Sequence, residues 1–201
     1  MSIVVEHEKR RKKILEKALD VFVDCGFEDA TFQKISDHCG ITRTTLYIYF
    51  KNKKEIFNYS IKQLLANVED DIQQIRSDPS LDSVGKITNI LLDIFKRLEE
   101  NRRLLSVVLD YLLHLSKNNA DPEQRIRRRT LCLRRILASL LIEGVKNGEL
   151  KTVNIKTTGD YLYSIIEAAI FRLVILQQKT AGDFRKAVIF AVKQLGAKKK
   201  D

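Results

Sequence analysis

The feature that most constrains the fold is a pair of short amphipathic segments within residues 31–50, hinged at Gly40. Thr31 and Thr42 stand where each segment begins, and a threonine side chain is a good acceptor for the free amides of a first helical turn. Gly40 lies where a tight turn favours a left-handed residue. We therefore predict two short helices joined by a turn.

The second of these helices is too short and too polar to be a core element. Leu46 and Phe50, four residues apart, mark its inward face. The side chains that then point outward from its first turns are Arg43, Thr44, Thr45 and Tyr47. A small helix that exposes such side chains suits insertion into the major groove of DNA. The sequence therefore predicts a helix-turn-helix.

The same block resembles the DNA-binding domain of the tetracycline repressor-like (TetR-type) transcriptional regulators. The resemblance runs from Gly26-Phe27 through residue 50 to Lys51-Asn52-Lys53-Lys54-Glu55-Ile56-Phe57. The family pattern is a glycine and an aromatic residue, then Thr, Ile-Ala, Ala-Gly-Val-Ser, Thr-Leu-Tyr, Tyr-Phe and Lys. This chain departs from the pattern at Ser36, Cys39 and Thr44, where Ala, Ala and Gly are usual.

The resemblance implies a fold, a function and a set of DNA contacts. By position it implies that base edges are read by Gln33, Arg43, Thr44 and Tyr47. It implies that phosphates are contacted by Thr31, Thr42, Thr45, Tyr49 and Lys53. The implied function is a repressor that binds a palindromic operator in double-stranded DNA as a homodimer and is released by a small-molecule effector. Activation instead of repression stays open, and the sequence names neither effector nor operator.

Nearly every other segment also has a helical pattern. Apolar residues recur with the 3.6-residue period over 8–25, 52–76, 82–99, 102–117, 121–147, 155–179 and 184–197. Only 2 prolines and 8 glycines occur among the 201 residues, which argues against a disordered linker or a loop-rich β fold. We predict an all-α chain with a three-helix DNA-binding domain at 1–51 and a helical ligand-binding and dimerisation domain at 52–201.

The segment 155–179 is apolar around much of its circumference. Such a helix must be buried on two sides, against its own domain and against a partner subunit. We place the homodimer interface at Ile166, Ala169, Ile170 and Leu173. A helix that is merely central to its own core is the alternative interpretation.

Aromatic and polar side chains on the central segments suggest a ligand cavity. The candidate lining residues are Phe95, Tyr111, His114, Tyr163 and Phe171. Core packing explains most of them equally well.

The net charge of +10 fits a polyanionic partner, and its location matters more than its size. The run Lys9–Lys13 opens the first helix, and Lys51, Lys53 and Lys54 flank the recognition helix. A second basic run lies between Arg125 and Arg135. It is either a solvated helix face or an accessory contact for a polyanion or acidic ligand.

Several classes of protein find no support in the sequence. Cys25, Cys39 and Cys132 lack metal-ligand spacing, and reduced thiols in a cytoplasmic protein are expected. We expect no metal and no cofactor. No catalytic constellation stands on a credible scaffold, so we do not expect an enzyme. No apolar run approaches the 18 residues of a membrane span. The main alternative function is a helical protein-interaction module that uses the helix-turn-helix without binding DNA.

Overall fold

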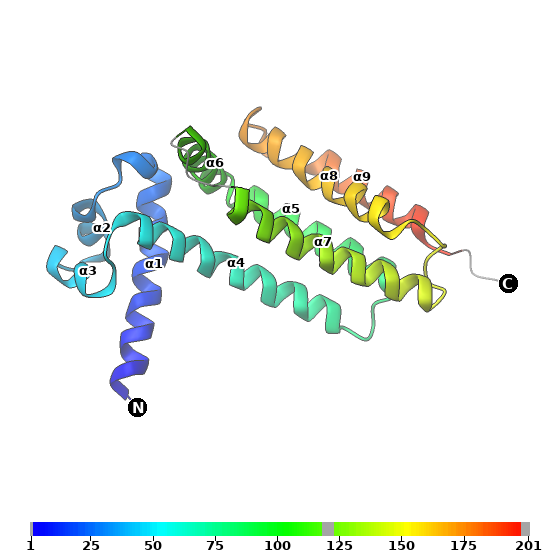
Figure 1. The fold of residues 1–201 in the computed structure, drawn as a ribbon, viewed down its shortest axis with the longest axis horizontal. Coiled ribbons are helices and arrows are strands. Elements are labelled where there is room, and N and C mark those ends of the chain that lie inside the picture. Colours follow the sequence, from blue (N-terminus) through cyan, green and yellow to red (C-terminus); the bar gives the residue numbers. More distant parts are fainter. Residues whose placement is uncertain (1, 118–122, 198–201) are drawn as a thin grey trace. The chain divides into compact units, whose positions relative to one another are not determined.

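The computed structural model describes residues 2–117 and 123–197, and these residues form nine helices. In chain order the helices are α1 (Ser2–Asp29), α2 (Phe32–Cys39), α3 (Arg43–Tyr49), α4 (Lys53–Ser77), α5 (Ser83–Glu100), α6 (Arg102–Lys117), α7 (Glu123–Lys146), α8 (Ile155–Val174) and α9 (Gly182–Leu195). Within the described ranges, extended backbone pairs at an isolated bridge between Leu150 and Gly196. The predicted all-α fold is confirmed (Figure 1).

The chain divides into two compact units. The first contains the residues up to Asp70 together with 106–111, and the second contains 71–105 and the residues from Leu112 onward. None of the helices among the described residues is long and apolar enough to cross a membrane.

The first unit is built on α1, which packs against α2. Gly26 interrupts α1 with a φ of 78°, in the left-handed region that favours glycine. The sequence predicted that the helix ends here, whereas the chain resumes a helical turn to Asp29. That turn brings Phe27 to within 6.0 Å of Phe22 and 5.2 Å of Phe57, measured between ring centroids. The kink at Gly26 therefore places Phe27 in a cluster of aromatic side chains with Phe22 and Phe57.

α4 is a single helix of 25 residues whose two ends belong to different units. Its first half packs on α1, where Ser60 Oγ donates a hydrogen bond to the Leu15 carbonyl at 2.8 Å. Because of this packing, the division between the compact units lies near Asp70 and not after residue 51. The functional division into 1–51 and 52–201 stays a prediction.

α5 is the central helix of the second unit and packs against α7, α8 and α9. Asp82 caps it, with its carboxylate accepting the Gly85 amide at 2.7 Å. The residues on the inward side of α5 are spaced by three or four and fully buried: Ile87, Ile90, Leu91 and Phe95. This spacing turns one apolar stripe of the helix to the core.

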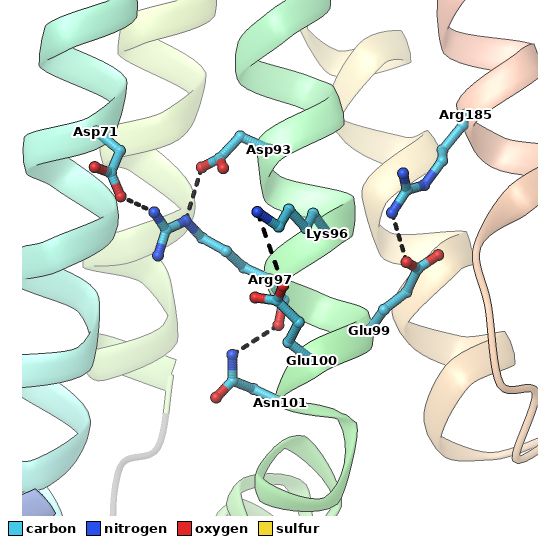
Figure 2. A network of polar contacts seen from close by, with 8 residues as sticks. All are labelled: Asp71, Asp93, Lys96, Arg97, Glu99, Glu100, Asn101 and Arg185. Carbon is cyan, nitrogen blue, oxygen red and sulfur yellow. Dashed lines mark hydrogen bonds and ion pairs between the residues drawn. The ribbon is translucent and has the colours of Figure 1, made fainter.

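Charged residues near the end of α5 tie it to α4 and α9 (Figure 2). Arg97 forms an ion pair with Asp71 of α4, and its Nε lies 2.7 Å from Asp93 Oδ2. Glu99 pairs with Arg185 of α9. A guanidinium shared by two carboxylates is geometrically specific, so Arg97 fixes the last turns of α4 on α5.

α8 ends at Val174, before the predicted end near residue 179. Gln177 takes a φ of 51°, which a continuing helix does not allow. The Gln178 amide then donates to the Arg172 carbonyl at 3.1 Å, so the chain turns back on the helix end.

Glu149, in the loop after α7, stabilises the start of α5. Its Oε2 accepts the amide of the buried Ser83 at 2.7 Å. Hydrogen bonds from the Ser83 side chain and backbone hold the pKa of Glu149 below its usual value. A carboxylate with a lowered pKa stabilises the fold at neutral pH, and this contribution is lost as the pH falls through the folded-state pKa.

We expect Glu149→Gln to lower the stability at pH 7 by about 1 kcal/mol, similar to the loss of a helix cap. The corresponding fall in Tm is about 2–4 °C. At a pH well below the usual glutamate pKa of about 4.3, the wild type and the variant should melt together. Thermal unfolding followed by circular dichroism checks this, with Glu69→Gln on the exposed side of α4 as the control. A difference in Tm that persists in acid would contradict the assignment.

Candidate nucleic-acid interface

The turn between α2 and α3 is fixed by the caps of the two helices. Thr31 Oγ1 accepts the Lys34 amide at 3.2 Å, and Thr42 Oγ1 accepts the Thr45 amide at 3.1 Å. Gly40 ends α2 with a φ of 69°, in the left-handed region expected for it. The predicted helix-turn-helix is therefore present, with its second helix over Arg43–Tyr49.

α3 has one buried and one exposed side. Leu46 is fully buried and Phe50, at its C-cap, is 1% exposed, as predicted. The side chains classed as exposed on this helix are Arg43, Thr44, Tyr47 and Ile48. Polar, aromatic and apolar groups are thus presented together on two turns of helix.

Arg43 and Tyr47 are held as a pair on this exposed side. Arg43 Nη2 donates to the Tyr47 hydroxyl at 3.2 Å, and the guanidinium carbon lies 5.6 Å from the centroid of the ring. The Tyr47 ring also stacks on Phe32 of α2, with 4.6 Å between the ring centroids. Since Phe32 is buried, the pair is supported from the body of the first unit, which limits the rotamer freedom it would lose on binding.

The other predicted contact residues near the turn keep free hydrogen-bonding capacity. The Thr31 hydroxyl oxygen accepts a cap bond, so its proton can still be donated to a phosphate oxygen. The Thr42 hydroxyl accepts the Thr45 amide and also shares a hydrogen bond of 2.8 Å with the Thr45 hydroxyl, in which either oxygen can be the donor. Gln33 Nε2 donates to Asp37 Oδ1 at 2.7 Å, which leaves its amide oxygen as an acceptor. Tyr49 stacks on His7 of α1 at 4.4 Å. These DNA contacts stay predictions.

The basic run on α1 is split between solvent and the protein. Lys9, Arg10, Lys12 and Lys13 are exposed. The Arg11 guanidinium carbon instead lies 4.2 Å from the ring centroid of Tyr59 and 5.1 Å from that of Phe50. Arg11 therefore packs α1 against Tyr59 of α4 and Phe50 at the end of α3. Its position in a run of basic residues does not indicate this role.

Lys53 has a different environment from the one expected of a phosphate contact. Its ammonium donates to the carbonyls of Phe27 and Glu28 at 2.9 and 2.6 Å and lies 4.8 Å from the Phe27 ring centroid. These carbonyls follow the kink at Gly26, so the side chain joins the end of α1 to the start of α4. Lys53 therefore has a structural role within the first unit, and its contact with phosphate stays a prediction; the neighbouring Lys54 is exposed.

We expect Lys53→Ala to lower the stability of the protein by about 1–2 kcal/mol, because two charge-assisted hydrogen bonds are lost. The slope of log affinity for DNA against log salt should stay unchanged. The matched variant Lys54→Ala should leave Tm unchanged and flatten that slope by about one unit if Lys54 contacts phosphate. Melting curves and anisotropy titrations on operator and random duplexes separate the two. A flattened slope with an unchanged Tm for Lys53→Ala would contradict the structural role and support the predicted phosphate contact.

The five residues predicted to line a pocket belong to separate packed groups. Phe95 is buried and packs near Phe184 of α9, at 6.5 Å between centroids. Tyr111 packs in the first unit, 4.3 Å from Phe27 and 5.0 Å from Phe57. The structure thus places these two predicted lining residues in different cores.

The remaining three predicted pocket residues have other surroundings. His114 is exposed, and Phe171 is 54% exposed on the outer side of α8. The Tyr163 ring faces the Arg134 guanidinium at 4.8 Å. Of the predicted set, Phe95 and Tyr163 stay candidates for a cavity within the second unit.

The basic run after residue 125 is described only in its last part. Arg134 Nη1 lies 3.0 Å from Asp160 Oδ1, so this arginine packs α7 on α8. Arg135 is exposed. The side chains of Arg125, Arg127, Arg128 and Arg129 and the predicted start of this helix at residue 121 lie outside the described residues.

The predicted dimer-interface residues face inward. Ile166, Ala169 and Leu173 are 3%, 0% and 3% exposed, which leaves them no surface to offer a partner. Ile170 is partly exposed. The large apolar side chains that are exposed on and just after α8, and on α9, are Tyr161, Phe171, Ile175, Leu176 and Phe190. Periodicity alone does not say which side of this apolar helix faces the core of its own chain, and the position of a dimer interface stays a prediction.

Cys39, at the end of α2, is half-buried, and this burial raises the pKa of its thiol. A thiol with a raised pKa is a poor nucleophile at neutral pH. Among residues 2–117 and 123–197, no three His, Cys, Asp or Glu side chains gather where they could hold a metal ion.

Part of the chain matches a known protein family, and most of its length is similar to a known regulator. Residues 14–59 match the family described as bacterial regulatory proteins, tetR family. The chain is 25% identical over 179 residues to a fatty acid metabolism regulator protein of Bacillus subtilis (strain 168), with 86% of this chain and 88% of that protein covered.

Two solved structures have a similar fold. A TetR transcription regulator from Haloarcula marismortui ATCC 43049 superposes with a TM-score of 0.81 at 19% identity, covering 94% of this chain and 99% of that one. The transcriptional regulator FadR from Bacillus subtilis, in complex with stearoyl-CoA, superposes with a TM-score of 0.69 at 22% identity, covering 90% and 95%.

Proposed function

Since the chain belongs to the tetR family of bacterial regulatory proteins and is a DNA-binding transcriptional regulator, we propose that it is a repressor that reads its operator with α3. The observation that carries this proposal is the exposed side of α3, on which Arg43 and Tyr47 are paired above the buried Phe32. Arginine in the major groove pairs bidentately with guanine O6 and N7.

The operator-binding form is a homodimer joined through α8 and α9. Both helices pack on α5, so their exposed sides face away from the core of the second unit (Figure 1). The exposed apolar side chains there, Phe171 and Phe190 among them, provide the surface that a two-fold interface requires. Two-fold symmetry then predicts a palindromic operator with half-sites about one helical turn or more apart.

The effector is a lipid-derived acyl thioester that binds within the second unit. Support comes from the relatives, of which one is named for fatty acid metabolism and another holds stearoyl-CoA. An acyl chain needs an apolar interior, and α5 with its neighbours supplies one. Net basic charge favours approach of the anionic head of such a ligand.

α4 transmits the effect of the ligand. It is continuous from Lys53, next to the recognition helix, to Ser77, and Arg97 fixes its last turns on α5 through Asp71. A ligand that favours a shifted position of α5 would therefore also favour a shifted α4. In the dimer, the two helix-turn-helix domains would then have a spacing that does not match the two half-sites of the operator.

Selection of binding sites from a library of random DNA duplexes tests the DNA-binding part of the proposal. The wild-type protein should enrich an inverted repeat that contains a guanine in each half-site. Sedimentation of the complex should give two protein chains for each duplex. Recovery of a single non-repeated site, bound by one chain, would contradict the dimeric mode.

Titration of stearoyl-CoA against the complex with the selected duplex tests the effector. Stearoyl-CoA should release the DNA, whereas coenzyme A alone, which lacks the acyl chain, should not. DNA binding that is unaffected by stearoyl-CoA would contradict the acyl thioester while leaving operator binding intact.

The alternative function, a protein-interaction module without DNA binding, is not favoured, because the relatives are transcriptional regulators. The relatives also support a non-enzymatic role. A cytoplasmic location, where chromosomal DNA is accessible, stays a prediction.

A further inference from the structure

Ile48 is 69% exposed, more than any other large apolar side chain among residues 5–70 of the first unit. It lies on α3 two residues after the fully buried Leu46, which places it about 200° around the helix and so on the outermost line. Thr44, four residues earlier, shares that line and is also exposed. The two exposed side chains on this line of α3, Thr44 and Ile48, thus both carry methyl groups.

Folding alone does not account for an isoleucine at this place. A β-branched residue is a weaker helix former than the straight-chain alternatives, and a side chain left in water gains little from burial. α3 has only seven residues, so each unfavourable choice weighs on its stability. An exposed isoleucine at this position therefore becomes favourable only when a binding partner buries its side chain.

We propose that Ile48 is a specificity-determining residue that reads a thymine, by packing its side chain against the 5-methyl group in the major groove. This rests on the proposed entry of α3 into that groove. The thymine methyl is the one apolar group that base edges present there, and it is recognised by apolar contact. Thr44 adds a second methyl group on the same line, one turn nearer the start of the helix.

The proposal also fixes where the thymine lies. Arg43 and Ile48 are five residues apart, which is about 7.5 Å along a helix. Successive bases along one strand are about 3.4 Å apart. The thymine read by Ile48 should therefore lie about two base pairs from the guanine read by Arg43, in each half-site.

Replacement of thymine by deoxyuridine in the selected duplex tests the contact, because it removes the methyl group and keeps the base pair. We expect the wild type to lose affinity about fourfold at one thymine of each half-site, the effect of exposing one methyl group. Ile48→Ala should bind the thymine duplex about as weakly, and should lose nothing further when that thymine becomes deoxyuridine. Arg43→Ala should keep the full effect of deoxyuridine.

Ile142→Ala is the matched control, since Ile142 is 55% exposed on α7 in the second unit. It should behave as the wild type on both duplexes. If Ile48→Ala loses as much as the wild type at every deoxyuridine position, or if the wild type loses nothing at any, the proposal is wrong. If the wild type selects no duplex sequence at all, operator binding itself is refuted. This outcome is distinct from failure of the Ile48 contact, because it is seen with the wild type alone.

Discussion

Phe190→Glu is expected to convert the proposed homodimer into monomers. Phe190 is 67% exposed on α9, and the proposed two-fold contact buries it against the partner subunit. A carboxylate placed in a dry apolar interface without a partner costs several kcal/mol. The dimer Kd should therefore rise by a factor of about one hundred or more. Affinity for a palindromic operator should fall with it, because each head then binds its half-site alone.

Sedimentation equilibrium measures the change in assembly directly. Ile142→Glu is the matched control, because it places the same charge at a similarly exposed isoleucine of α7 and should leave the protein dimeric. Circular dichroism should show that Phe190→Glu keeps its helical content, since that side chain contributes nothing to the core of a single chain. A Phe190→Glu variant that remains dimeric would place the interface on another surface.

Arg43→Ala is expected to weaken operator binding by about 1–3 kcal/mol, the effect of losing a bidentate contact with guanine. Binding to random duplexes should change little, because the phosphate contacts remain. The measurement is a fluorescence-anisotropy titration with both duplexes. Equal losses on the two duplexes would reassign Arg43 to a phosphate contact.

The loss in Arg43→Ala should be partly structural in origin, because Tyr47 loses its hydrogen-bond donor. Tyr47→Phe separates the two effects. It removes the same hydrogen bond and keeps the ring on Phe32, so its loss should be the smaller one.

The helix-turn-helix could be predicted from the sequence because its signals are local. Thr31, Gly40 and Thr42 determine the caps and the turn within a few residues, and the inward direction of Leu46 follows from spacing alone. The same spacing turns Ile48 outward, but spacing does not tell whether an exposed apolar residue contacts DNA.

The features that the sequence could not predict are contacts between residues that are distant in the chain. Lys53 binds carbonyls of Phe27 and Glu28, and nothing in its neighbourhood of basic residues indicates this. Ile166 and Phe171 are both apolar residues of α8, and only the packing of α8 on α5 and α7 reveals that the first is buried and the second exposed. Periodicity predicts the apolar residues of a helix, but only tertiary packing determines which of them are buried.

The central claim is sequence-specific DNA binding through the exposed side of α3. It is tested most directly by titrating the wild type with its selected duplex and with a scrambled duplex of the same composition, at several salt concentrations. The selected duplex should bind at least about 10³-fold more tightly at physiological salt, and log affinity for both duplexes should fall linearly with log salt. Equal affinity for the two duplexes, or an affinity that does not respond to salt, would contradict it.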